Sequence, residues 1–269
     1  METDSKTVAI FGGGVMGETL LSGLLRAGRD PRSLVITERR ENRAQELRDR
    51  YGVRVVQNAE AATAGTLILV VKPQDMAALL DEIADLVDPQ ALVISLAAGI
   101  STEFLETRLP AGTAVIRVMP NTPALVDEGM SAISAGSCGA DHHLAEAEVL
   151  LAAVGRVRRV PEHQQDAVTA ISGSGPAYVF FIVESMIEAG VHLGLPRATA
   201  TDLAMQTAFG AAKMLRETGE HPTVLREQVT SPGGTTAAAL RELERHGVRS
   251  AFLSALEAAR DRSRELGSQ

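Results

Sequence analysis

The chain has 269 residues, of which 45% are hydrophobic and 22% are charged, and its formal net charge is -8. This composition is that of a folded globular protein and excludes a disordered or fibrous chain. The length suffices for two domains, and the excess of acidic residues argues against nucleic acid as a partner.

An apolar run from Val8 to Phe11 breaks into glycines and then into a helical pattern. Gly12, Gly14 and Gly17 have the spacing of the G-x-G-x-x-G motif. In this motif the first glycine permits a sharp exit from the strand, the second lets backbone N–H groups reach a pyrophosphate, and the third lets the helix pack on the strand. A helix from Met16 to Ala27 would direct its positive N-terminal end at that anion. The stretch therefore predicts a dinucleotide site.

The second strand is expected over 34–37, and Glu38, Arg39 and Arg40 follow it about where a cofactor's adenosine ribose is read. An acid there would accept a hydrogen bond from a free 2′-hydroxyl and favour NAD, whereas an arginine would pair with a 2′-phosphate and favour NADP. A charge-assisted hydrogen bond contributes roughly 1.5–3 kcal/mol, which outweighs mild repulsion if the Glu38 carboxylate turns away. The sequence favours NADP, and at least one of the two arginines is expected to be only a solvated charge.

Helices and apolar strands continue to alternate after this point, as in a doubly wound, mostly parallel sheet. Helices are expected over 42–51, 58–64, 73–87 and 101–109, and strands over 53–56, 67–71, 92–96 and 114–118. Asn58 opens one of these helices and is interpreted as its N-cap, and Ser101 is interpreted in the same way. Pro73 suits the first turn of its helix.

Three short segments lie at the carboxyl ends of strands, where open α/β sheets bind ligands. Lys72 stands at the first, and the small residues Ala97, Ala98 and Gly99 form a lip at the second that would let a flat ring approach. Asn121 lies in a proline-containing turn at the third and offers both a donor and an acceptor, to a carboxamide or to a bound water. The alternative for each segment is that it serves only to connect two elements.

Two edge strands are expected over 130–134 and 157–160, around a helix over 141–154. His142 and His143 are adjacent and therefore point to different faces of that helix, and no third ligand lies at metal spacing. We expect solvated histidines and no metal.

From Glu162 the strands stop and amphipathic helices run to the C-terminus, so we expect a dinucleotide-binding domain over 1–161 and an all-α domain over 162–269. The expected helices of the second domain span 162–171, 176–193, 196–217, 222–230, 235–246 and 249–265. The second of them has apolar residues on more than one face, which favours burial in a dimer.

The signals for cellular location agree with one another. Cys138 is the only cysteine, which excludes an intrachain disulfide and favours a reducing compartment. The N-terminus is polar and shows no apolar signal region before the first strand. The longest apolar stretch, about 177–195, contains Glu184, Glu188 and His192, which argues against a membrane span and for a buried helix. We expect a cytoplasmic protein with no membrane partner.

Two glycine-containing loops of the helical domain are candidate sites, 172–178 and 229–236. In the second loop, Gly233 and Gly234 would expose backbone N–H groups and the hydroxyls of Thr235 and Thr236 would add donors. The N-terminus of the next helix points at the same spot, so the loop predicts a cradle for a small carboxylate. The alternative is a helix cap with a flexible lead-in.

At these residues the chain resembles the pyrroline-5-carboxylate reductase family over its full length. Six motifs follow the order found in that family: Gly12 to Gly17, Val71-Lys72-Pro73, Ala97-Ala98-Gly99, Met119 to Pro123, Ser172 to Tyr178 and Thr230 to Thr236. The resemblance implies reduction of 1-pyrroline-5-carboxylate to L-proline by a Rossmann-like domain followed by an all-α dimerisation domain. It also implies an active site built across an interlocked homodimer, and dimers that assemble further, often into decamers.

The resemblance also implies roles for individual residues. Ser231, Gly234, Thr235 and Thr236 would hold the substrate, with Thr236 near the ring nitrogen and assigned as the catalytic residue. The cofactor would be NADPH, although many relatives carry a small or neutral residue at the position of Glu38, which leaves NADH open. The predicted cofactor-binding set is Gly12, Gly13, Gly14, Val15, Met16, Gly17, Glu38, Arg39, Arg40, Asn58, Val71, Lys72, Pro73, Ala97, Ala98, Gly99 and Asn121.

Two other functions stay open from the residues alone. A dehydrogenase of another small acid, such as a β-hydroxyacid, would be expected to place a lysine or histidine base in the helical domain, where Lys213 is the only lysine. A protein that binds NADP and signals by changing its assembly would bind the cofactor without transferring a hydride.

Overall fold

The structure is a computed structural model that describes residues 4–267, with side chains from residue 7 onward. The chain forms two compact units. The first comprises the chain through Ser174 together with the segment from Ala259 onward, and the second comprises Gly175–Ala258.

The first unit contains an eight-stranded sheet in the part of the chain that the structure describes, with strand order β3-β2-β1-β4-β5-β6-β7-β8. All neighbouring strands are parallel except β6 and β7, which are antiparallel. The strands are β1 (Asp4–Phe11), β2 (Leu34–Thr37), β3 (Arg54–Val56), β4 (Ala64–Leu69), β5 (Leu92–Ser95), β6 (Ala114–Met119), β7 (Gly129–Ala135) and β8 (Gly155–Arg159).

The direction in which the strands are added reverses between β1 and β4. Such a reversal opens a crevice at the carboxyl ends of the two strands, which is where doubly wound proteins bind their ligands. Backbone hydrogen bonds continue past the strand ends here, from Gly12 N to Thr37 O at 3.2 Å and from Val70 N to Phe11 O at 2.9 Å. These bonds place the glycine loop at the centre of that edge.

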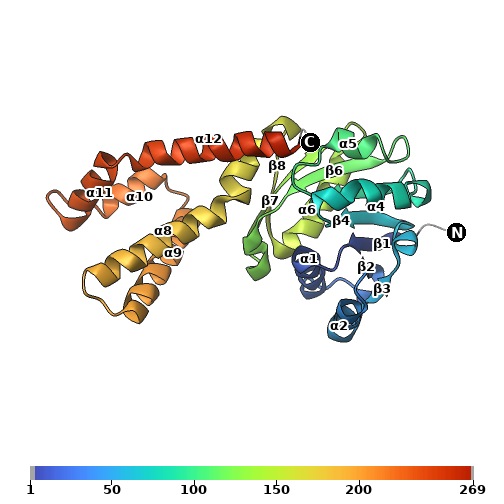
Figure 1. The fold of residues 1–269 in the computed structure, drawn as a ribbon, viewed down its shortest axis with the longest axis horizontal. Coiled ribbons are helices and arrows are strands. Elements are labelled where there is room, and N and C mark those ends of the chain that lie inside the picture. Colours follow the sequence, from blue (N-terminus) through green and yellow to red (C-terminus); the bar gives the residue numbers. More distant parts are fainter. Residues whose placement is uncertain (1–3, 268–269) are drawn as a thin grey trace. The chain divides into compact units, whose positions relative to one another are not determined.

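Helices cover both faces of this sheet (Figure 1). They are α1 (Val15–Arg26), α2 (Glu41–Tyr51), α3 (Asn58–Ala61), α4 (Met76–Ile83), α5 (Thr102–Glu106), α6 (Asp141–Leu151) and α7 (Gln165–Val168). Alternate strand residues face opposite sides, so Ile10 packs with Leu20 of α1 in one core, whereas Phe11 packs with Leu80 of α4 in the other. Burial on both faces explains why these strands are continuous apolar runs.

The predicted strands and helices are found with shifted ends, and three details differ from prediction. β7 was expected at an edge, but it pairs with both β6 and β8, because strand order depends on long-range pairing that a local pattern does not encode. The helix expected over 73–87 has short 3₁₀ turns at 73–75 and 84–86, with α4 between them. Asn58 is not an N-cap, since Gln57 holds that position and Asn58 Nδ2 donates to Glu82 Oε2 at 2.9 Å.

The second unit consists of helices, as predicted. They are α8 (Gly175–His192), α9 (Arg197–Thr218), α10 (Pro222–Gln228), α11 (Thr235–Arg245) and the first half of α12 (Val248–Gly267). α8 and α9 pack closely where Gly190 meets Ala200, because a Cβ added to that glycine would lie 3.0 Å from the Ala200 Cβ. Small residues at this crossing let the two backbones approach.

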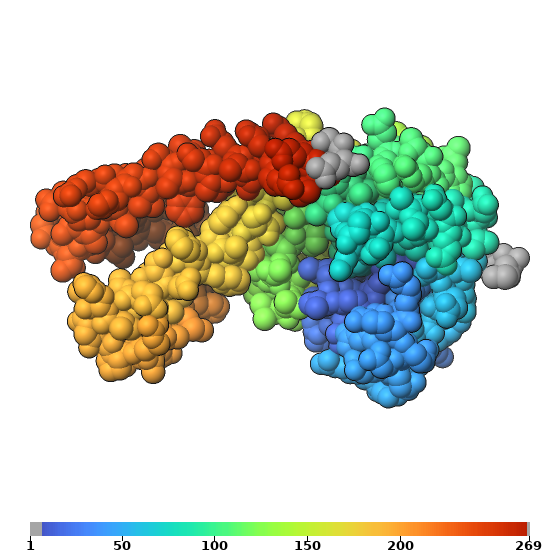
Figure 2. Space-filling model, in the orientation of Figure 1, coloured from blue at the N-terminus to red at the C-terminus, as the bar shows by residue number. Residues whose placement is uncertain are grey.

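The prediction that the apolar helix is buried is wrong for the single chain. Phe180 and Phe181 of α8 are 66% and 69% exposed, and α8 has no buried residue among those that the structure describes. Figure 2 shows the hairpin that α8 and α9 form, in yellow and orange, at the surface of the chain. By length and composition alone, the helical run Glu162–His192 could also cross a membrane. A helix that is apolar on several sides needs a cover that α9 alone does not supply.

The two compact units divide at 174/175, whereas the predicted domains divide at 161/162. The intervening segment bonds to the sheet. Glu162 accepts from Thr102 N at 2.8 Å and from Arg117 Nη1 at 3.3 Å, and the buried Gln165 donates through Nε2 to Ser134 Oγ at 2.7 Å. These polar contacts keep the first helical turns with the strands.

Candidate functional site

The glycine loop has the geometry that its spacing predicts. Gly12 has φ +116°, a conformation that side chains rarely adopt, and a Cβ added to Gly17 would lie 1.9 Å from Gly12 O. A Cβ added to Gly14, in contrast, would meet nothing within 4 Å. Gly12 and Gly17 are therefore required by the fold itself, and the space beside Gly14 is open to a ligand.

The loop and the helix after it fit the pyrophosphate of a dinucleotide. Gly14 is the N-cap of α1 in an extended conformation, so the N–H groups of the first turn, beginning at Val15, have no partner within the helix. The helix dipole adds a positive potential at the same point. Val15 is exposed beside this turn, whereas Met16 packs partly into the core and holds the helix in place.

A polar brace, formed by Glu18, Arg43, Arg50 and Tyr51, holds the glycine loop from behind. Arg43 Nε donates to Gly13 O at 3.2 Å, and its guanidinium also pairs with Glu18. Glu18 accepts from Tyr51 Oη at 2.8 Å and from Arg50 Nη1 at 3.0 Å. This brace was not predictable from the sequence, because its members lie on two helices that only the fold brings together.

The brace predicts a pH-dependent stability. Desolvation acts to raise the pKa of Glu18, but hydrogen bonds from Tyr51 and Arg43 outweigh it and leave the pKa below its usual 4.5. A carboxylate with a lowered folded pKa stabilises the protein above its unfolded pKa and loses that contribution as the pH falls through the folded value. Glu18→Gln should therefore cost about 1–3 kcal/mol of unfolding free energy at neutral pH and progressively less below pH 4.5.

Urea unfolding of the two proteins across this pH range measures the difference. Glu41→Gln is the matched control, because Glu41 pairs with Arg48 on the surface with its side chain 81% exposed, and we expect a change of less than about 0.5 kcal/mol. A Glu18→Gln penalty that stays constant from neutral pH to well below pH 4.5 would contradict the role given to the brace.

The adenosine end of the predicted cofactor site is at Glu38, directly after β2. Its carboxylate accepts hydrogen bonds from Arg40 N at 2.9 Å and from the Arg40 guanidinium at 3.1 Å, so the two side chains form an ion pair with each other. The side-chain hydrogen bond from Arg40 holds the pKa of Glu38 below its usual value. Arg39 is exposed beside them. The carboxylate thus turns toward Arg40 rather than away from both arginines.

The segments after β4 and β5 line one hollow of the first unit, with a volume of about 680 Å³. It gathers Pro73, Ala98 and Gly99 from the predicted set, whereas Val71, Lys72 and Ala97 neighbour them in the chain without lining it. The other lining residues are Gln74, Ile100, Phe104, Thr169, Ser174, Ala259, Arg262, Ser263 and Leu266. Ala98 and Gly99 line this hollow, but Gly99 also lies against the end of α12, since a Cβ added to it would be 3.5 Å from Gly267 N. The approach of a flat ring to these small residues remains a prediction.

The end of α12 was not expected in this hollow. Ser263 is buried and its Oγ donates to Asp166 Oδ1 at 2.8 Å, which fixes α12 against α7. Arg262 pairs with Glu265 at 2.7 Å. No pattern near the glycine motifs signals this approach, because the two segments are far apart in the sequence.

Asn121 uses both ends of its side chain for the protein itself. Its Oδ1 accepts from Met130 N at 2.8 Å, and its Nδ2 donates to Ser172 O at 3.2 Å. Ser172 lies in the five-residue π-helical turn Thr169–Gly173, and a Cβ added to Gly173 would lie 2.3 Å from Met119 Cε. Asn121 therefore ties the end of β6 to the segment that leads into α8. Its predicted contact with the cofactor remains a prediction.

Removing this tie should destabilise the first unit. We expect Asn121→Ala to lower the unfolding free energy by about 1–3 kcal/mol, because the Met130 N–H loses its acceptor. Asn121→Asp keeps that acceptor but turns a charged oxygen toward Ser172 O in place of the donor, so it too should be less stable than the parent. Chemical unfolding of the three proteins tests the order, and equal stability of Asn121→Ala and the parent would contradict it.

The candidate substrate loop lies entirely in the second unit, between α10 and α11. Gly233 has φ +70°, and Gly234 N donates to Ser231 O at 3.0 Å. The amide of Gly234 is therefore used within the turn, contrary to the expectation that it is exposed to a ligand. Gly234 is the N-cap of α11, and Thr235 and Thr236 are its first two residues, so their amides and hydroxyls are the available donors.

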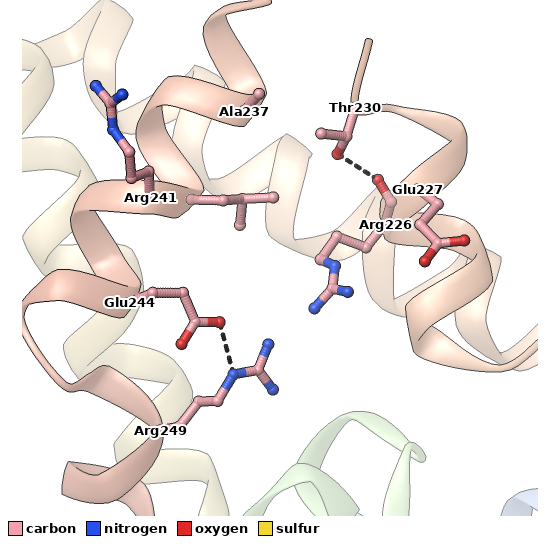
Figure 3. A pocket seen from close by; sticks show the side chains of 8 residues that line it. Arg226, Glu227, Thr230, Ala237, Arg241, Glu244 and Arg249 are labelled. Carbon is pink, nitrogen blue, oxygen red and sulfur yellow. Dashed lines mark hydrogen bonds and ion pairs between the residues drawn. The ribbon is translucent and has the colours of Figure 1, made fainter. Parts of the chain in front are cut away.

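A second hollow of the same unit, of about 400 Å³, begins at Thr230 beside this loop (Figure 3). Arg226, Arg241 and Arg249 contribute to its lining. Arg249 Nε donates to Glu244 Oε1 at 2.6 Å, and Thr230 Oγ1 donates to Arg226 O at 2.6 Å. The first bond ties the C-terminal end of α11 to the start of α12, and the second closes the end of α10 just before the loop. Among the described residues, no group of three His, Cys, Asp or Glu side chains could hold a metal ion.

Comparisons with known proteins match both parts of the chain. Residues 162–266 match the family described as pyrroline-5-carboxylate reductase dimerisation, and residues 7–99 match the family described as NADP oxidoreductase, coenzyme F420-dependent. A pyrroline-5-carboxylate reductase of Corynebacterium melassecola is 50% identical over 97% of this chain and 98% of its own.

Solved structures agree with these matches. A pyrroline-5-carboxylate reductase of Coxiella burnetii superposes with a TM-score of 0.93 at 37% identity, over 98% of this chain and 99% of that chain. The Plasmodium falciparum pyrroline carboxylate reductase, solved with NADP bound, has a TM-score of 0.86 at 28% identity, over 99% of this chain and 100% of that chain.

Proposed function

Since this chain belongs to the pyrroline-5-carboxylate reductase family, we propose that it reduces 1-pyrroline-5-carboxylate to L-proline, the last step of proline biosynthesis. The observation that carries the proposal is that the similarity spans the glycine loop and the substrate loop together. The cofactor is NADPH, with NADH as the alternative.

The bound cofactor supplies a hydride for the imine carbon of the substrate. Backbone amides at the start of α1 and the open side of Gly14 hold its pyrophosphate, and the small residues Ala98 and Gly99 leave room for its flat ring. The remaining predicted cofactor contacts, including Lys72 and Asn58, belong to the same proposal.

The substrate loop orients the other reactant. The first-turn amides of α11 and its helix dipole bind the carboxylate of the imine, and the Thr235 and Ser231 hydroxyls add donors. Thr236 places its hydroxyl near the ring nitrogen. The imine accepts a hydride readily when this nitrogen carries a proton. The loop therefore either receives the iminium form from solution, or binds the neutral imine, whose nitrogen takes a proton from water through the Thr236 hydroxyl. Catalysis then rests on orientation and electrostatics.

The structure of the helical unit weakens the main rival. A dehydrogenase of another small acid needs a base near its substrate, and Lys213 lies within α9, where its Nζ pairs with Glu217 at 3.6 Å. This lysine is a surface group in an ion pair, which is a poor candidate for that role.

The proposed assembly is a homodimer with interlocked helical units, in which a second copy covers the apolar residues of α8, and five such dimers form a decamer. The exposed phenylalanines of α8 support a protein cover rather than a membrane, since Glu184, Glu188 and His192 share the helix. We also place the enzyme in the cytoplasm, a reducing compartment, because its single cysteine, Cys138, can form no intrachain disulfide. Sedimentation velocity of the purified protein measures the number of subunits.

One assay tests the proposed reaction. The protein is mixed with NADPH and 1-pyrroline-5-carboxylate, the absorbance of the reduced nicotinamide is followed, and the product is identified by chiral chromatography. We expect L-proline in an amount equal to the NADPH consumed, with a parallel run for NADH. Cofactor binding without turnover would favour a sensor, and turnover only with another acid would favour the rival dehydrogenase.

A further inference from the structure

The carboxylate of Glu38 is held in a fixed position at the end of β2. Its side chain is 8% exposed, and it accepts three hydrogen bonds from Arg40, through N, Nε and Nη2. A carboxylate with this many donors does not swing freely, so its charge and direction are properties of the folded chain.

Glu38 also lies directly against the glycine loop. A Cβ added to Gly13 would be 3.0 Å from Glu38 Oε2 and 2.8 Å from Leu47 Cδ1. The carboxylate therefore borders the loop that receives the pyrophosphate, on the β2 side where the adenosine ribose of a dinucleotide is read. It can accept a hydrogen bond from a 2′-hydroxyl at this place, whereas a 2′-phosphate would meet a like charge.

Arg40 is the natural partner of a 2′-phosphate, but its guanidinium is engaged with Glu38. A phosphate must either draw Arg40 away from this carboxylate or depend on the exposed Arg39. While Arg40 stays in place, its positive charge neutralises the charge of Glu38. The pair then offers no unpaired positive charge to a 2′-phosphate, and a ribose without this phosphate can bind without disturbing it.

From this geometry we propose that Glu38 is a specificity-determining residue that limits the preference for NADPH over NADH, by binding the 2′-hydroxyl and by holding Arg40 away from a 2′-phosphate. The inference rests on the proposed function for its cofactor class and concerns the adenosine end alone. The effect of Glu38 is measured as the affinity for NADPH relative to that for NADH. This ratio can be determined without any reaction at the imine.

Titration calorimetry with NADPH, NADH, adenosine 2′,5′-bisphosphate and 5′-AMP tests the inference without any turnover. In Glu38→Gln, which keeps the shape and removes the charge, the affinity for NADPH relative to NADH should rise about tenfold. The affinity for the bisphosphate relative to 5′-AMP should rise in parallel. Arg40→Ala should shift both ratios the opposite way, because it leaves the Glu38 charge unpaired.

Glu41→Gln is the matched control, since it removes an acidic charge three positions along the chain and should leave both ratios unchanged. Ratios in Glu38→Gln within twofold of the parent would overturn the inference, as would a shift toward NADPH in Arg40→Ala. A chain that binds both dinucleotides with the expected shifts but does not reduce the imine would sink the proposed function and leave this inference standing. A chain that binds neither dinucleotide would overturn both.

Discussion

Replacing Thr236 by alanine is expected to lower kcat/KM for imine reduction by about 100- to 1000-fold while leaving the affinity for NADPH unchanged. Thr236 is the second residue of α11, so its hydroxyl stands among the unpaired amides of a helix N-terminus. Removing one oriented donor from such a site costs roughly 3–4 kcal/mol of transition-state stabilisation. Steady-state kinetics measure the first quantity and titration calorimetry the second.

Thr236→Ser is the matched variant, because it keeps the hydroxyl and loses only a methyl group. We expect its kcat/KM to stay within about tenfold of the parent value. A loss of NADPH affinity in Thr236→Ala would indicate a wider disturbance of the fold rather than the loss of one catalytic group. Undiminished turnover in Thr236→Ala would remove this residue from the mechanism.

Placing a charge on α8 is expected to break the assembly. Phe181 is 69% exposed in the single chain, and its burial by a second copy would contribute about 1.5–3 kcal/mol, whereas a buried unpaired carboxylate costs several kcal/mol. Phe181→Glu should therefore sediment as a monomer. It should also lose most of its activity if the active site forms across the dimer.

Val149→Glu provides the control for this variant. Val149 is 73% exposed on α6 of the first unit, so the same change of charge there tests a general effect on solubility or folding. We expect it to sediment like the parent protein. A Phe181→Glu protein that keeps both its assembly and its activity would show that α8 is not the dimer surface.

The sequence predicts those features that depend on local patterns. Continuous apolar runs and glycine spacing are enough to place β1, the loop after it and α1. The glycines are a reliable signal here because the backbone at Gly12 and Gly17 leaves no room for a side chain. The amphipathic helices after Glu162 follow from their periodicity in the same way. The order of these elements was therefore predictable, with ends shifted by a few residues.

Features that depend on long-range contacts were not predictable. β7 lies inside the sheet because of its two partners, and neither partner is visible in its own residues. The brace between Glu18 and Arg43, like the approach of Ser263 to Asp166, joins helices distant in the sequence. Burial of α8 was predicted from composition, but the single chain leaves its phenylalanines exposed.

The predicted site residues are distributed over the two compact units. Those assigned to the cofactor lie in the first unit, and those assigned to the substrate lie in the second. The side-chain partners of Glu38 and Asn121 could not be read from the sequence, because a residue type states which bonds are available but not which atoms use them. For Asn121 the structure shows both ends of the amide in use by Met130 and Ser172.

Transfer of deuterium from the cofactor to the substrate shows whether this protein reduces the imine directly. The enzyme is supplied with 1-pyrroline-5-carboxylate and NADPH that carries deuterium at both C4 positions, and the product is analysed by mass spectrometry and NMR. We expect L-proline with a single deuterium at C5. Unlabelled proline, or a label at any other carbon, would contradict direct reduction of the imine by this protein.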